Sequence, residues 1–244
     1  MLRFSDGRNF GRTLTGLCLI AAPILLLIAQ VVSPDVDDDN KVKELANVAA
    51  HKGSYLAGGL IFMVAGLVLV VAGFGLVHLF RGRRLTLGQV AGALVALGAA
   101  ASTGFYAFTT IEYEMVNVSG LDHAQMARLL DKGQDSTTAL PLFLVFLVGI
   151  VIGLILLGIA AWRSRVVPVW AGIALIVAGV LGFAGGESKA VNIVDFAILI
   201  VGFGSLGLAA LRMSDEEWDA PRGAAVPPGG EAPVEPTPTP APAA

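Results

Sequence analysis

Hydrophobic residues gather in six long runs separated by shorter polar stretches. Each run is about 20 residues long, the length that an α-helix needs to cross a hydrocarbon core about 30 Å thick. The pattern therefore predicts an all-α fold, a polytopic membrane bundle of six transmembrane helices. The expected spans are residues 13–32, 55–80, 87–110, 140–162, 167–185 and 191–211.

Basic residues fall at the start of the first run, after every second run and after the last one. They are Arg3, Arg8, Arg12, Arg81, Arg83, Arg84, Arg163, Arg165 and Arg212. Lys and Arg next to short loops stay on the cytoplasmic side of a membrane. We therefore expect a multi-pass protein of the bacterial plasma membrane with both termini in the cytoplasm. The first run is too long for a signal-peptide core and lacks a clean cleavage site, which favours a retained helix.

Polar residues alternate with apolar ones at helical spacing in 40–51 and 121–132. Two short amphipathic helices are expected there, lying on the outer end of the bundle as a lid. Eight prolines after position 220 favour an extended, disordered tail. The expected organisation is a cytoplasmic N-terminus over 1–12, a transmembrane domain over 13–212 and a disordered Pro/Ala-rich cytoplasmic tail over 213–244.

Two halves of the chain read alike at an offset of about 80 residues. The Lys-Gly pair at 52–53 corresponds to 132–133, and the Arg-x-Arg motif at 81–83 corresponds to 163–165. The pattern indicates a parallel duplication, although apolar spans also resemble one another by composition. Parallel repeats occur in transporters and in bundles that transport nothing.

Small residues four apart predict close helix packing, because backbones in a membrane approach through glycine and alanine. The candidates are Gly88, Gly92, Ala96, Ala100 and Gly104 in the third span, Gly149 and Gly153 in the fourth, and Gly182 and Gly186 in the fifth. We expect them where the second to fifth spans meet, with the first and sixth packed around them. Association of copies into a homo-oligomer is the alternative.

Composition agrees with the membrane prediction. Hydrophobic residues make up 55% and charged residues 14%, against about 25% charged in soluble domains, and the mean hydropathy is +0.76. A formal net charge of −3 argues against binding nucleic acid, which is held mainly through Lys and Arg. With Cys18 as the single cysteine, no intramolecular disulfide is possible. No cofactor is expected.

One acidic residue lies within a predicted span. Asp195 is about one turn into the sixth span, with Asn192 one turn earlier on the same face, and Tyr106 is expected near the same outer mouth. Ionisable groups inside a membrane often mark transport paths. The alternatives are a hydrated interfacial residue or an ion pair with Lys52, Lys132 or Lys189.

Metal-binding residue types also fall on the predicted outer side. They are His51, His123, Glu112 and Glu114. Their spacing matches no known ligand motif, so no metal is assigned to them. No hydrolase triad, phosphate-binding loop or paired-carboxylate motif is present in the sequence, and no catalytic residue is expected.

Short Arg and Trp motifs carry one resemblance. Residues 162–165 read Trp-Arg-Ser-Arg and 167–170 read Val-Pro-Val-Trp. With the runs 55–83 and 112–115, they resemble an uncharacterised domain-of-unknown-function family of multi-span membrane proteins from high-GC Gram-positive bacteria. The resemblance implies a six-helix bundle in the plasma membrane and carries over no active residues.

The expected function is that of a non-enzymatic scaffold or accessory subunit. Its partners would be membrane lipids and a membrane-protein partner or a second copy. The alternative is a small-molecule or lipid transporter with a cavity between the two repeats. A membrane metalloprotein or enzyme with an outer-face site comes third.

Overall fold

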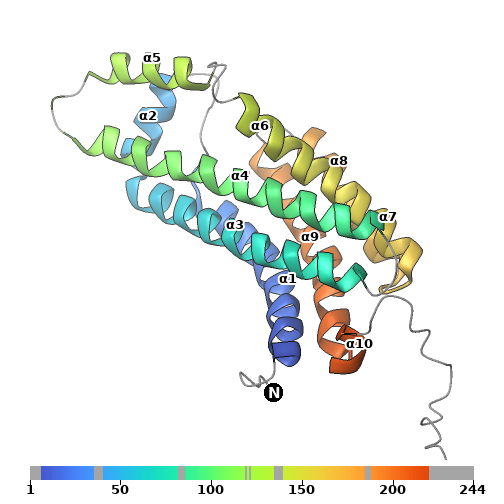
Figure 1. Ribbon diagram of the computed structural model, residues 1–244. Helices are drawn as coiled ribbons and strands as arrows, with labels where there is room; N and C mark the ends of the chain where they lie inside the picture. The colour runs from blue at the N-terminus through green and yellow to red at the C-terminus, as the bar shows by residue number, and fades with distance from the viewer. Residues whose placement is uncertain are drawn as a thin grey trace, which may run out of the picture.

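The computed structural model describes residues 7–35, 41–81, 86–118, 120, 122–134, 140–184 and 188–219. Within these ranges the regular structure is entirely helical (Figure 1), which confirms the all-α prediction. The helices are α1 (Gly7–Val32), α2 (Lys41–Ala50), α3 (Lys52–Arg81), α4 (Thr86–Asn117), α5 (His123–Gln134), α6 (Leu140–Leu147), the π-helix η1 (Val148–Ile152), α7 (Gly153–Ser164), α8 (Val169–Ala184), α9 (Lys189–Arg212) and α10 (Asp215–Asp219).

Five helices of the described chain are long and apolar enough to cross a membrane. They are α1, α3, α4, the continuous helix formed by α6, η1 and α7, and α9. The predicted span over 167–185 corresponds to α8, which has 16 residues. At 1.5 Å per residue α8 is about 24 Å long, shorter than a hydrocarbon core of about 30 Å.

The long helices form a closed ring in chain order. α1 packs on α3, α3 on α4, α4 on the α6–η1–α7 helix, α7 on α8, α8 on α9, and α9 returns to α1. The expectation that the first and last spans surround the others was therefore wrong. Glycines allow the closure: a Cβ added to Gly207 of α9 would be 2.7 Å from the carbonyl oxygen of Gly16 in α1.

The predicted outer helices pack together at one end of the ring (Figure 1). α3 and α4 are the longest helices, with 30 and 32 residues, about 45 and 48 Å, and Lys52 at the start of α3 reaches Asn117 at the end of α4. There α2 and α5 form a second small core around Leu45, Met126 and Ala127. We call this the α2–α5 end, and the opposite one, where α1 begins, the α10 end.

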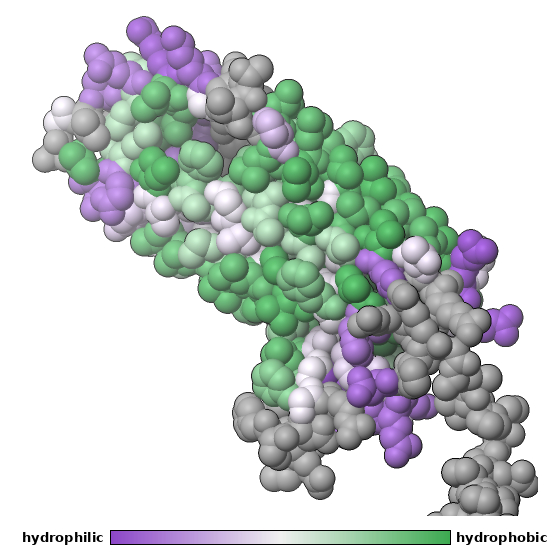
Figure 2. Space-filling view, viewed as in Figure 1, coloured by the Kyte–Doolittle hydropathy of each residue, from purple (hydrophilic) through white to green (hydrophobic). Residues whose placement is uncertain are grey.

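Apolar side chains cover the outside of the ring. Figure 2 shows them over the middle of the visible face, with hydrophilic residues at both ends. Phe74, Leu97 and Phe183 are more than half exposed, at 67%, 57% and 63%. An apolar belt between two polar ends is the surface that a bilayer solvates, so the chain is a membrane protein.

The glycine stripe of the third span packs over its first half only. Gly92 meets the α3 backbone, where an added Cβ would be 2.9 Å from Val77 N, and Ala96 is 4% exposed. Ala100 is exposed, and at Gly104 an added Cβ would meet only a Leu142 methyl group at 3.6 Å. Four residues advance a helix by about 400°, so a stripe of this spacing drifts by about 40° per step. Its later members turn away from α3.

Gly149 and Gly153, two further predicted packing positions, lie tightly against residues of α4 that are not part of its glycine stripe. A Cβ on Gly149 would be 2.5 Å from Cα of Gly98 in α4, and a Cβ on Gly153 would be 3.1 Å from Val95 N. Gly149 lies within η1, where the helix widens by one residue per turn. In the fifth span Gly182 is exposed, and Gly186 lies outside the described residues.

The segment assigned to the tail contains a docked helix. α10 covers 215–219, inside the predicted disordered region 213–244, and the rest of that region beyond 219 lies outside the described residues. Trp218 is 9% exposed and its ring centroid is 4.7 Å from that of His78. Arg12 Nε lies 3.1 Å from Asp215 Oδ1. These partners lie on α1 and α3, far away in the sequence, which is why local composition did not predict the docking.

Candidate functional site

Asp195 is a buried acidic residue in the ring, near the α2–α5 end. α9 begins at Lys189, and six residues further on the carboxyl group lies about 9 Å along the helix. The residue is 6% exposed.

The carboxylate lies against a bare stretch of α8. A Cβ added to Gly182 would be 3.2 Å from Oδ2 of Asp195 and would meet little else. Oδ1 has no hydrogen-bond partner within the described residues. A buried polar group without a hydrogen bond destabilises the fold by about 1–3 kcal/mol, and more when it is charged. The arrangement leaves one oxygen of Asp195 available to a ligand.

None of the three lysines considered as ion-pair partners is paired with Asp195 in the described structure. Lys189 Nζ donates to the carbonyl oxygen of Ser33 at the end of α1. Lys52 Nζ lies 3.4 Å from Oδ1 of Asn117, and Lys132 is exposed on α5. Among the described residues, no ion pair is formed by Asp195.

Aromatic rings from three helices form a row that ends at Phe196, the residue after Asp195. Phe62 of α3 stacks on Tyr106 of α4, with centroids 4.4 Å apart and planes within 2°. Phe62 also approaches Phe196, the residue after Asp195, at 6.2 Å. Sequence reasoning selected Tyr106 but missed both phenylalanines. The packing of α3, α4 and α9 in the tertiary structure brings these residues together. In the sequence, the position of Phe196 directly after Asp195 was a signal that could have selected it.

Asn192 belongs to the same face of α9 as Asp195. It is half-buried, and its backbone N–H donates to the carbonyl oxygen of Ser188 at 3.0 Å. Because it precedes Asp195 by three residues, it lies about one turn closer to the α2–α5 end.

The four candidate metal ligands have separate surroundings. The Tyr55 hydroxyl donates to Oε2 of Glu112, which is 8% exposed. Glu114 is exposed, and His51 Nδ1 lies 2.8 Å from Oδ1 of Asn47. The side chain of His123 lies outside the described part of the structure. Within that part, no three His, Cys, Asp or Glu residues gather as metal ligands do.

The chemistry available at Asp195 is electrostatic. Apolar surroundings make an isolated carboxylate unfavourable, and a proton or a cationic group removes the penalty. Aromatic faces add attraction for a cation through their negative π-surface, by about 0.5–2 kcal/mol. Asp195 is thus a group that attracts a cation, and the packed rings of Phe196, Phe62 and Tyr106 begin at the next residue of α9. We call these four residues the Asp195 site.

The sequence places the chain among known relatives over most of its length. Residues 14–211 match the family described as Domain of unknown function (DUF4386). The chain belongs to this family. The matched segment runs from α1 almost to the end of α9, so the DUF4386 domain contains the whole ring and the Asp195 site and stops before α10. No curated protein and no solved structure matches the chain.

Proposed function

We propose that the protein is a transporter of lipophilic cations in the bacterial plasma membrane. The observation that carries the proposal is the buried carboxylate of Asp195, with one oxygen unpartnered within the described residues. Among the functions that the sequence allows, transport is the one that uses this group. A scaffold has no need of it.

The proposal includes six crossings with both termini in the cytoplasm. Val167, before α8, and Met213, after α9, line one cavity at the α10 end. At the other end of α8, Gly182 lies against Asp195, near the start of α9. α8 therefore covers most of the depth of α9, which supports counting it as a crossing, the fifth in chain order. The basic residues then assign the α10 end to the cytoplasm and the Asp195 site to the outer half of the membrane.

The ring is packed shut between the Asp195 site and the α10 end. Leu76, Leu157 and Leu206 are fully buried there, in the cytoplasmic halves of α3, of the α6–η1–α7 helix and of α9. A cation at Asp195 would therefore exchange with the outer side in this conformation. Release to the cytoplasm would need these helices to separate, which is the alternating access expected of a transporter.

Transport is tested with ethidium as the probe, in proteoliposomes that enclose DNA. The fluorescence of ethidium reports its entry. We expect wild-type protein to accelerate entry, and Asp195→Asn, which keeps the size and loses the charge, to abolish the acceleration. Glu114→Gln is the matched control because Glu114 is exposed. Entry no faster than in protein-free vesicles, or equal entry with Asp195→Asn, would refute the proposal.

Labelling with dicyclohexylcarbodiimide tests the site without a transport assay. This apolar reagent reacts with carboxyl groups in apolar surroundings, so peptide mass spectrometry should find it on Asp195 and not on Glu114. Ethidium should protect Asp195 from the reagent. Labelling of the two residues to the same extent would show that Asp195 is not secluded as the structure has it.

A scaffold or accessory role is the second candidate, favoured by α6. No residue of this helix is buried, and Phe143, Leu144 and Val145 are 47%, 46% and 44% exposed. A helix held on the ring by so little of its surface offers an apolar face to a partner helix or a second copy. A photo-crosslinker at Leu144 would give one discrete protein adduct in membranes under this role. Adducts with lipid alone would count against it.

A further inference from the structure

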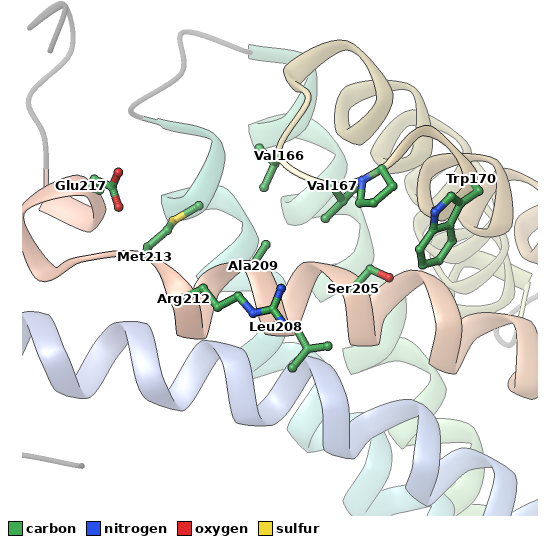
Figure 3. Close-up of a pocket in the computed structure, with 10 residues that line it drawn as sticks. Val166, Val167, Trp170, Ser205, Leu208, Ala209, Arg212, Met213 and Glu217 are labelled. Atoms are coloured by element: carbon green, nitrogen blue, oxygen red, sulfur yellow. The ribbon is translucent and has the colours of Figure 1, made fainter. Parts of the chain in front are cut away.

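A cavity of about 400 Å³ opens at the α10 end of the ring, away from the Asp195 site. Its walls come from the α7–α8 turn, the first turn of α8, the last two turns of α9, and α10 (Figure 3). Val167, Trp170, Leu208 and Met213 supply apolar surface, and Arg212 and Glu217 supply the charges. We call this cavity the Arg212 groove.

The two charged residues of the groove differ in their partners. Oε2 of Glu217 accepts the backbone N–H of Ser214 at 2.9 Å, and the N–H of Glu217 donates to Oγ of Ser214 at 3.1 Å. This reciprocal pair is a capping box that begins α10. Arg212 is exposed and has no hydrogen bond or ion pair within the described chain. Its guanidinium is the cationic group that the groove offers to a ligand, beside the Glu217 carboxylate that Ser214 holds.

The groove changes from polar to apolar along α9. Arg212 is the last residue of the helix, and the lining reaches back to Ser205, about 10 Å toward the membrane interior. Figure 3 shows the Arg212 side chain lying back along α9 beside Leu208, with Trp170 across the groove. Trp170 is 56% exposed, as tryptophans at a membrane interface are.

We propose that the Arg212 groove binds one anionic phospholipid, with its phosphate on the Arg212 guanidinium and an acyl chain along Leu208 and Trp170. Charge complementarity selects this occupant: a guanidinium pairs with phosphate through two parallel hydrogen bonds. Anionic lipids are the ligands that a cytoplasmic leaflet supplies to interfacial Arg residues. The site is independent of Asp195 and exists whether or not the protein transports cations.

Native mass spectrometry from nanodiscs made of equal amounts of phosphatidylglycerol and phosphatidylcholine tests the proposal. Wild-type protein should retain one phosphatidylglycerol in preference to phosphatidylcholine. Arg212→Gln should lower that preference about fivefold, since one interfacial Arg contributes about 1 kcal/mol to binding an anionic lipid. Arg163→Gln should behave as wild type, because Arg163 is also exposed near the α10 end but lies outside the groove lining.

A matched tryptophan pair tests the apolar half of the groove and stands in if Arg212→Gln fails to fold. Trp162 and Trp170 are 51% and 56% exposed, and only Trp170 lines the groove. Trp170→Ala should reduce the retained phosphatidylglycerol while Trp162→Ala leaves it unchanged. Equal retention of the two lipids by wild type, or equal losses within either matched pair, would overturn the proposal.

Discussion

Gly98→Ala is the change that most directly tests how the ring is packed. Gly98 lies in α4 where it crosses η1, and an added Cβ would be 2.6 Å from Ile150 N and 2.7 Å from the carbonyl carbon of Gly149. Comfortable contacts need about 3.5 Å. Both obstacles are backbone atoms, so no side chain can rotate away, and the two helices must separate by about 0.9 Å.

Gly104→Ala is the matched control on the same helix. Its Cβ would meet only the Leu142 methyl group at 3.6 Å, an ordinary contact. Both substitutions exchange glycine for alanine inside α4, so the gain in helix propensity, about 1 kcal/mol, cancels in the comparison. What remains is the cost of overpacking at Gly98, about 1–3 kcal/mol.

Unfolding in mixed micelles of increasing SDS content, followed by tryptophan fluorescence, measures the difference. We expect Gly98→Ala to unfold at lower SDS than Gly104→Ala, by about 1–3 kcal/mol in the free energy of unfolding. The four-residue stripe in the sequence ranks these positions the other way round, because it includes Gly104 and omits Gly98. Equal stability of the two variants, or a less stable Gly104→Ala, would refute the packing described for α4 and η1.

Two further predictions concern the α10 end. Asp215→Asn removes the partner of Arg12, in a pair that is 15% and 35% exposed. It should weaken α10 docking by about 1 kcal/mol and raise acrylamide quenching of Trp218. The control Glu216→Gln changes an exposed side chain and should leave quenching at the wild-type level. Arg165 has a positive φ of 53° where α7 ends, a conformation that favours glycine. Arg165→Gly should therefore stabilise the fold by about 1 kcal/mol, and Arg163→Gly, inside α7, should destabilise it by about as much. The same SDS titration measures both variants, and equal changes in their free energies of unfolding would contradict the prediction.

The sequence predicts the long helices well because the bilayer imposes a local rule. Every backbone polar group in the hydrocarbon must be satisfied within its own segment, so an apolar run of sufficient length becomes a helix. Five of the six runs are long apolar helices in the structure. The ends of the helices depend instead on contacts with distant parts of the chain. α1 starts at Gly7, ahead of the predicted residue 13, in a segment where Asn9 and Arg12 pair with Asp215.

The packing faces could not be read from residue spacing alone. A stripe of small residues four apart is a local pattern, whereas the face that a helix presents depends on which neighbours surround it. Gly98 and Gly149 show the difference: they contact each other across 51 residues of sequence, and only Gly149 stood out beforehand.

For the Asp195 site, the sequence alone supplied an acidic residue within an apolar run and a tyrosine of matching depth. Its surroundings came from the tertiary structure, because the ring seats Gly182 against the carboxylate, brings Phe62 next to Tyr106 and Phe196, and holds Lys189 on the end of α1. Hydrophobicity is a property of each residue and does not depend on how the helices are arranged. Burial without a partner is a property of the arrangement, and the packing of α9 against α8 places the Asp195 carboxylate beside Gly182.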